Sequence, residues 1–255
     1  MNDELIRKHE GHVTRLTLNR PQKANALSAA LVEGLIDAVD YASTDGTRLL
    51  ILDGAGAHFC AGFDFTGYQD LSDGDLALRF IRIELLLQAL YHAPFDTLAL
   101  AHGRVFGAGA DLVAGCASRV GAPDASFRMP GLRFGVVLGT RRFAARVGSD
   151  KAREILAASR SLDAKEALAI GFLTRIAAQG EWDSLAAAAH AQCERLTPAA
   201  SAALRRQTLT DTRADDMAVL TRSVSTPGLK ERIRIFREET SNRPNTERGT
   251  QGSPP

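Results

Sequence analysis

The stretch "FGAGADLVAG", Phe106 to Gly115, follows closely on the apolar run "TLALA" and guides the interpretation of the whole chain. Glycines alternating with small residues, then an acid and an apolar segment, are typical of a tight loop that passes into a helix. The first N–H groups of such a helix have no partner within it, so they can bind a ligand. The stretch therefore predicts a strand, a binding loop and a helix that begins near Asp111, whose side chain is either a catalytic acid or a helix cap.

The segments before this stretch also alternate between strand and helix. "HVTRLTLN" alternates apolar and polar residues up to Pro21, and "RLLILDGAG" is a continuous apolar run, so the first predicts a strand and the second a strand buried on both faces. Between them, apolar residues at helical spacing behind Ser28 predict a capped helix. Strands alternating with helices indicate an α/β fold with parallel crossovers. From residue 149 onward the pattern is almost wholly helical, and the polar segment 241–255 predicts a disordered tail.

Composition narrows the class of protein. With 31 basic and 30 acidic residues the net charge is +1, and there is no basic block, so a nucleic-acid partner is not expected. Cys60, Cys116 and Cys193 are odd in number and lack metal-type spacing, which favours a reduced compartment and predicts no metal site. The sequence shows no signal-peptide pattern and no run of about 18 apolar residues, so it predicts a cytoplasmic protein without a membrane partner.

Two loops carry the candidate chemistry, "HFCAGFDF" from His58 to Phe65 and "FGAGAD" from Phe106 to Asp111. Each places a glycine beside small residues just after a buried strand, where parallel sheets usually bind ligands. Two convergent backbone N–H groups from such loops can hold a developing oxyanion. Phosphate binding is less favoured, because neither the P-loop pattern nor the third glycine of the dinucleotide fingerprint is present. Close packing of a helix on a strand is the alternative reason for these glycines.

Four segments in this order and spacing resemble the crotonase family, also called enoyl-CoA hydratase/isomerase: "LNRPQKANALSAALVEGL", "ILDGAGAHFCAGFDF", "AHGRVFGAGADL" and "LDAKEALAIGFLTRI". The segment "GLKERIRIFREE" is similar to the family's closing helix. The resemblance implies an α/β spiral of repeated strand–strand–helix (ββα) units. It further implies an acyl-CoA-binding core over residues 1–196, a helical trimerisation region over 197–240, and assembly as a homotrimer or a dimer of trimers.

Carried over by motif, the resemblance places the N–H groups of Phe63 and Ala108 in an oxyanion hole and makes Asp111 the catalytic acid. It assigns further residues to contact with coenzyme A or the acyl group: Lys23, Ala24, Ala26, Ala61, Asp64, Phe65, Tyr68, Gly107 and Gly131. The coenzyme A thioester is the substrate, and no separate cofactor is implied.

One departure from the family pattern leaves the reaction open. Hydratases of the family carry a second acid after a proline, and here the residue after Pro130 is Gly131. The favoured function is hydration, dehydration or double-bond isomerisation of an enoyl-CoA. The alternatives are thioester hydrolysis, decarboxylation, or acyl-CoA binding without catalysis. Arginines near the missing acid either bind a substrate carboxylate or another anion, or make surface and subunit contacts: Arg128, Arg133, Arg141 and Arg142.

Overall fold

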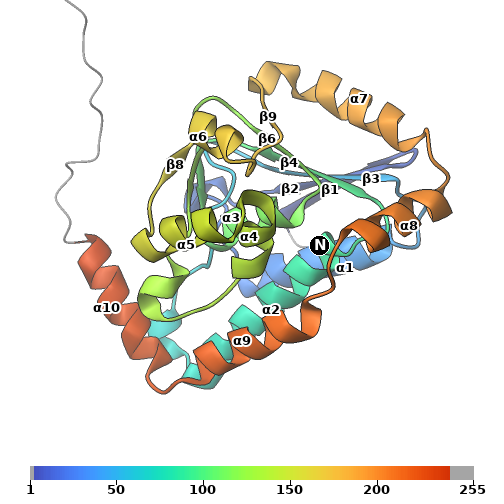
Figure 1. Ribbon diagram of the computed structural model, residues 1–255. Helices are drawn as coiled ribbons and strands as arrows, with labels where there is room; N and C mark the ends of the chain where they lie inside the picture. The colour runs from blue at the N-terminus through green and yellow to red at the C-terminus, as the bar shows by residue number, and fades with distance from the viewer. Residues whose placement is uncertain (1–2, 242–255) are drawn as a thin grey trace, which may run out of the picture.

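The computed structural model describes residues 3–241, which form two sheets covered by helices (Figure 1). The larger sheet has the strand order β1 (Leu5–Glu10), β2 (Val13–Leu18), β3 (Leu49–Gly54), β4 (Asp96–Ala101), β6 (Ser118–Gly121) and β9 (Arg175–Ile176). The smaller sheet has the order β5 (Arg104–Phe106), β7 (Ser126–Arg128) and β8 (Leu162–Asp163).

Parallel pairing dominates the larger sheet, as the alternation of strands and helices predicts. The pairs β2–β3, β3–β4, β4–β6 and β6–β9 are all parallel. The exception is β1, an antiparallel edge strand whose residues are mostly exposed. The sequence did not predict β1, because an exposed strand has no apolar face to show.

Helices enclose the larger sheet on both faces, and their bounds are α1 (Ala29–Ala42), α2 (Asp73–Tyr91), α3 (Ala108–Gly115), α4 (Thr140–Val147), α5 (Ser149–Ala158), α6 (Ala164–Ala169), α7 (Trp182–Cys193), α8 (Pro198–Thr208), α9 (Arg213–Ser225) and α10 (Leu229–Ser241). Along β3, Leu50 and Leu52 face the main core with α1–α3. The alternate residues Leu49 and Ile51 pack with Trp182 of α7 on the opposite face (Figure 1). This alternation explains why the β3 segment is apolar throughout.

Strand–strand–helix units confirm the predicted fold class, since β4, β5 and α3 follow one another with β4 and β5 in different sheets. The helix in this unit begins at Ala108, before the predicted start near Asp111. The prediction of an almost wholly helical segment after residue 149 is wrong at β8 and β9. Each spans two residues, too few for a periodic pattern.

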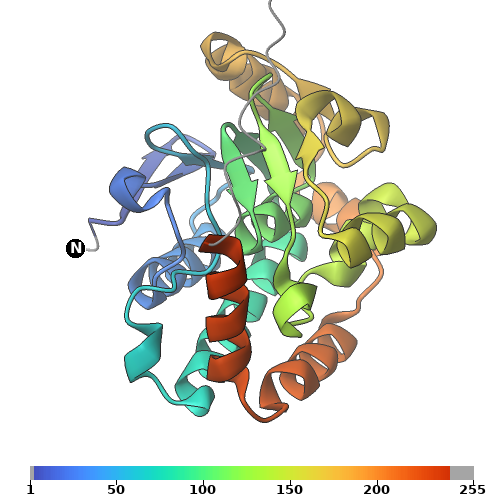
Figure 2. The same cartoon turned by 90° about the vertical axis from the view of Figure 1, so that its left-hand side faces the viewer.

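The predicted C-terminal helical region, residues 197–240, contains α8 and α9 and all of α10 except Ser241. Leu220, Val224, Leu229 and Ile233 of α9 and α10 are buried in the main core of the same chain. Figure 2 shows α10, in red, standing across the face of the molecule that is turned toward the viewer. Phe236 of this helix packs against the main core. Apart from Ser241, the predicted disordered tail lies outside the described residues. In the described part of the chain, no helix is both long and apolar enough to span a membrane.

Candidate active site

The two glycine-containing loops lie against each other at the end of the parallel strands. A side chain at Gly62 would place its Cβ 2.6 Å from the carbonyl oxygen of Phe106, and one at Gly109 would come 2.4 Å from that of Cys60. Gly62 and Gly107 also have φ angles of +88° and +52°, which side-chain-bearing residues rarely adopt. These glycines therefore allow the two loops to pack closely and also to adopt the turns that a binding loop needs.

Two backbone N–H groups are left free where the loops meet. Hydrogen bonds from Leu27 N to Gly62 O (2.7 Å) and from Asp64 N to Leu27 O (3.2 Å) tie down the chain on either side of Phe63. Ala108 is the first residue of α3, so its N–H has no partner within the helix. Among the described residues, neither the Phe63 nor the Ala108 N–H donates to a protein acceptor. This is the arrangement expected of an oxyanion hole.

These amides border a cavity of about 70 Å³ with a mostly apolar wall. Aromatic rings form much of it: Phe63 stacks on Phe80 with ring centroids 4.4 Å apart, and Phe134 meets Phe236 at 4.9 Å. Since Phe236 belongs to α10, the C-terminal helix closes the cavity of its own chain. The cavity therefore suits a small apolar acyl group.

Asp111 is buried in this wall and is 4% exposed. The helix cap interpretation is wrong, because α3 has Gly107 at its N-cap and no side-chain cap hydrogen bond. Burial raises the pKa of Asp111 to about 8, while nearby Arg142 lowers it and Glu84 raises it. Gly139 leaves room for it, since a Cβ there would lie 1.9 Å from Asp111 Oδ1. The carboxyl is thus an acid whose two protonation states are both accessible near neutral pH.

The arginines near the missing acid do not reach the cavity. All have partners in the protein and none lines the cavity wall: Arg128, Arg133, Arg141 and Arg142. Arg142 is buried and ion-paired with Glu84 of α2 and, at 3.3 Å, with Asp216 of α9. Arg142 therefore acts on Asp111 through its charge, and the hypothesis that these arginines hold a substrate anion finds no support in the structure.

The predicted site residues divide into two groups. The cavity wall contains Ala61, Phe63, Phe65, Gly107, Ala108, Asp111 and Gly131. The wall does not include Lys23, Ala24, Ala26, Asp64 and Tyr68. Gly131 confirms that no acid occupies the second position, so the described wall has a single ionisable side chain.

Residues outside the wall shape the approach to it. Lys23 is exposed at the end of the short helix Pro21–Lys23. The next carbonyl, of Ala24, accepts a hydrogen bond from Ala61 N at 2.9 Å, which joins this loop to the cavity. Tyr68 is 3% exposed, so its ring is part of the core.

Sequence reasoning missed two buried residues that hold these loops. Arg20 pairs with Asp64 at 2.8 Å and also donates to the carbonyl oxygen of Ala26. Asn25 has a φ of +53°, accepts from Arg20 N and donates to His58 O at 2.7 Å. Both lie in a polar loop whose pattern does not distinguish buried from solvated residues.

Other missed residues also line the cavity, some next to Gly131 and some from distant segments: Phe80, Met129, Pro130, Leu132, Phe134, Val136, Leu138, Thr140, Leu156 and Phe236. Among them only Thr140 has a polar side chain. It is the first residue of α4, next to Gly139, and the glycine in "VLGTRRF" is the one local signal that marks this turn.

Known proteins resemble this chain in sequence and in fold. The pattern described as Enoyl-CoA hydratase/isomerase matches residues 8–240. A Mycobacterium leprae protein named "Probable enoyl-CoA hydratase echA6" is 35% identical over 189 residues, covering 71% of this chain and 74% of that protein. A crystal structure from Bordetella parapertussis, described as an enoyl-CoA hydratase/isomerase, is 50% identical with a TM-score of 0.91, covering 94% of this chain and 99% of that one.

A structure with much lower sequence identity has the same fold. The enoyl-CoA hydratase from Bacillus halodurans has a TM-score of 0.80 at 18% identity, covering 91% of this chain and 99% of that one, which speaks for the fold alone. The ββα units, two free amides and buried acid thus define a protein of the crotonase class. The chain belongs to the enoyl-CoA hydratase/isomerase family, as its sequence motifs predict.

Proposed function

We propose that the protein shifts the double bond of a small enoyl-CoA, with Asp111 as the acid–base group for both proton transfers. The observation that carries this proposal is the cavity wall, in which Asp111 is the single ionisable side chain among the described residues. The free N–H groups of Phe63 and Ala108 border the same cavity and support a role in binding the thioester oxygen. The coenzyme A thioester is the substrate, and the reaction needs no separate cofactor.

Each step of the isomerisation then has a group to perform it. Ionised Asp111 removes a proton from the α carbon of a 3-enoyl-CoA, and the electron pair moves onto the thioester oxygen. The two N–H groups donate to this enolate oxygen, and loss of one such donor typically costs about 3 to 4 kcal/mol. The protonated carboxyl returns the proton to the γ carbon as the enolate collapses. The double bond then joins the α and β carbons, and the carboxylate is regenerated.

The raised pKa of Asp111 fits this double role. A group with a pKa of about 8 has appreciable amounts of both forms near neutral pH. A base with a much lower pKa would be too weak to remove an α proton, and one with a much higher pKa would rarely be ionised. Burial in an apolar wall is therefore a functional feature of this acid.

Hydration of an enoyl-CoA is a second candidate, favoured by the name of the M. leprae relative and by Thr140. Its hydroxyl is the other polar side chain of the described wall and can orient a water molecule. We expect Thr140→Val to lower hydration of a 2-enoyl-CoA at least about tenfold while isomerisation is retained. Equal losses in both reactions would argue against a water-orienting role.

The decisive experiment offers short 3-enoyl-CoA and 2-enoyl-CoA thioesters and follows the products by chromatography. Isomerisation that falls at least about a hundredfold in Asp111→Asn supports the proposal, whereas hydration without isomerisation would favour the second candidate. Release of free coenzyme A would indicate a thioester hydrolase, and carbon dioxide from a malonyl-type thioester a decarboxylase. Binding of the thioesters without turnover would indicate a catalytically silent member and would overturn the proposal.

We further propose roles for Lys23 and for the two parts of the chain, and a cytoplasmic location. The exposed position of Lys23 supports contact with a coenzyme A phosphate at the mouth of the site. Residues 1–196 would form the acyl-CoA-binding core, although Phe236 adds one side of the cavity from outside this range. Residues 197–240 would also make the trimer contacts, which is supported by exposed apolar side chains in this region, Leu204 (55%) and Ile235 (44%). Free cysteines are compatible with the cytoplasm. Sedimentation of a stable monomer at micromolar concentration would contradict the trimer.

A further inference from the structure

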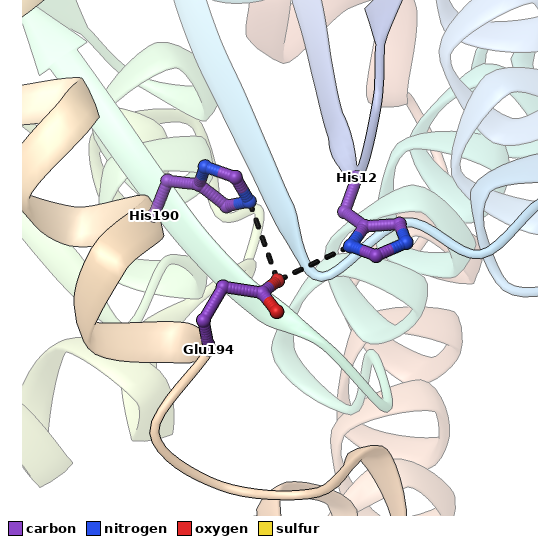
Figure 3. A group of neighbouring side chains, drawn as sticks. All are labelled: His12, His190 and Glu194. Carbon is purple, nitrogen blue, oxygen red and sulfur yellow. Dashed lines mark hydrogen bonds and ion pairs between the residues drawn. The ribbon is translucent and has the colours of Figure 1, made fainter.

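A second cluster of functional groups lies away from the acyl-CoA site, where α7 meets the turn between β1 and β2 (Figure 3). His12 comes from the turn, His190 from the last part of α7, and Glu194 caps the end of that helix. His190 and Glu194 are four residues apart, which places both side chains on one face of the helix. In the described part of the chain, these three residues form the one group with the reach to hold a metal ion together.

The distances within the cluster match those of a metal-binding site. His12 Nδ1 lies 3.2 Å from Glu194 Oε1, and His190 Nε2 lies 3.3 Å from the same oxygen. Ligand atoms about 2.1 Å from a tetrahedral Zn²⁺ are about 3.4 Å apart, so these two edges already have the right length. All three ligand atoms lie within 4.8 Å of one another, so small side-chain rotations bring the third edge into range.

The two oxygens of the Glu194 carboxylate face different partners. Oε1 points toward the imidazoles in Figure 3. Oε2 faces Arg48 at 3.7 Å, and Arg48 is itself held by hydrogen bonds to the carbonyl oxygens of Cys193 and Leu196. Because Arg48 holds Oε2, the Glu194 carboxylate presents only Oε1 to a metal ion. Contacts of this kind, made behind the ligands, orient the ligands of a metal site.

The imidazole of His190 also lacks a conventional partner. Its Nε2 atom is shielded from solvent, accepts or donates no hydrogen bond among the described residues, and is ion-paired with Glu194 Oε1 at 3.3 Å. The adjacent thiol of Cys193 is excluded as a ligand, because it is buried and donates to Asp96 Oδ2 at 3.2 Å. The donor set is thus two imidazoles and one carboxylate, which is typical of zinc and related ions.

We propose that His12, His190 and Glu194 bind one divalent transition-metal ion, with Zn²⁺ as the best fit, whose coordination is completed by water. The side chains are 55%, 34% and 40% exposed, so water has access to the remaining position. The ion ties the end of α7 to the β1–β2 turn, two segments far apart in the chain. The proposal departs from the sequence-based prediction of no metal site, which rested on cysteine spacing and did not consider histidines brought together by folding.

The site is distinct from the acyl-CoA cavity. The α7 helix packs on one face of the larger sheet with Trp182, whereas Asp111 and α3 belong to the main core on the other face (Figure 1). The bound ion is therefore structural and takes no part in thioester chemistry. It should raise the melting temperature without changing turnover.

The test uses the untagged full-length protein after treatment with a chelator. Calorimetric titration with ZnCl₂ should show one saturable site per chain, and Zn²⁺ should raise the melting temperature. His12→Ala and His190→Ala should each weaken the affinity at least about tenfold and abolish the thermal shift. Their acyl-CoA turnover should match that of the wild type, which shows that the variants are folded.

The matched control is His92→Gln. His92 lies 3.9 Å from Asp211, so it forms an imidazole–carboxylate pair in which the described residues supply no second imidazole. This variant should bind Zn²⁺ as the wild type does. The proposal is overturned if the wild type shows no saturable binding, or if His12→Ala and His190→Ala bind as tightly as His92→Gln.

Discussion

Replacing Asp111 by asparagine should make the folded protein more stable, increasingly so as the pH rises. The buried carboxyl has a pKa of about 8 in the folded chain against 3.8 for an ordinary aspartate. Between these values Asp111 is protonated in the folded chain and ionised in the unfolded chain, so the unfolded state binds fewer protons. Stability therefore falls as the pH rises through this window, whereas a neutral asparagine is free of this effect.

The magnitude follows from the width of the window. Each pH unit between about 4 and 8 should add about 1.4 kcal/mol to the stability difference between Asp111→Asn and the wild type. At pH 7 the accumulated difference is about 4 kcal/mol as an upper limit, because the interior relaxes around a buried charge. A cap role would instead give a difference near zero at neutral pH, because asparagine caps a helix about as well as aspartate.

Urea unfolding of both proteins at one protein concentration, repeated across this pH range, measures the difference. The slope of the stability difference against pH is diagnostic. Any hydrogen-bonding difference between the asparagine amide and the carboxyl adds the same amount at every pH. Asp150→Asn is the matched control, since its side chain is 97% exposed and its difference from the wild type should stay nearly flat. A flat difference for Asp111→Asn as well would refute the argument that burial keeps Asp111 protonated.

Further predictions follow from the same geometry. For isomerisation by ionised Asp111, kcat/KM should rise about tenfold per pH unit below a pKa near 8 and level off above it; a rate that falls with pH would instead indicate a reaction started by the protonated acid. Glu84→Gln should move this kinetic pKa downward, because it removes a negative charge that raises the pKa of Asp111 and leaves Arg142 in place; an upward shift in the pH–rate profile would contradict this. Gly109→Ala should destabilise the protein by about 1 to 3 kcal/mol or more, because its Cβ would lie 2.4 Å from Cys60 O, whereas Gly180→Ala meets nothing within 4 Å and should melt near the wild-type temperature.

Residues whose roles depend on the backbone could be predicted, while those that depend on distant packing could not. The glycines of the two loops indicated sharp turns after buried strands, and Gly62 and Gly107 indeed have positive φ angles. By contrast, Phe236 reaches the cavity from a helix at the far end of the chain, and no local pattern records that contact. The same holds for Arg142, which resembles a surface arginine in the sequence but is buried against Glu84.

The residue at position 131 influences the pKa of Asp111. With Gly131 in place of an acid, the wall around Asp111 is apolar apart from Thr140, so little there solvates an ionised carboxylate. A second ionised acid would raise the pKa of Asp111 further and divide the acid and base roles between two groups. Without it, burial and Glu84 raise the pKa while Arg142 lowers it, and the result lies near 8. The loss of one carboxyl therefore leaves the other in the range where a single group can both accept and return a proton.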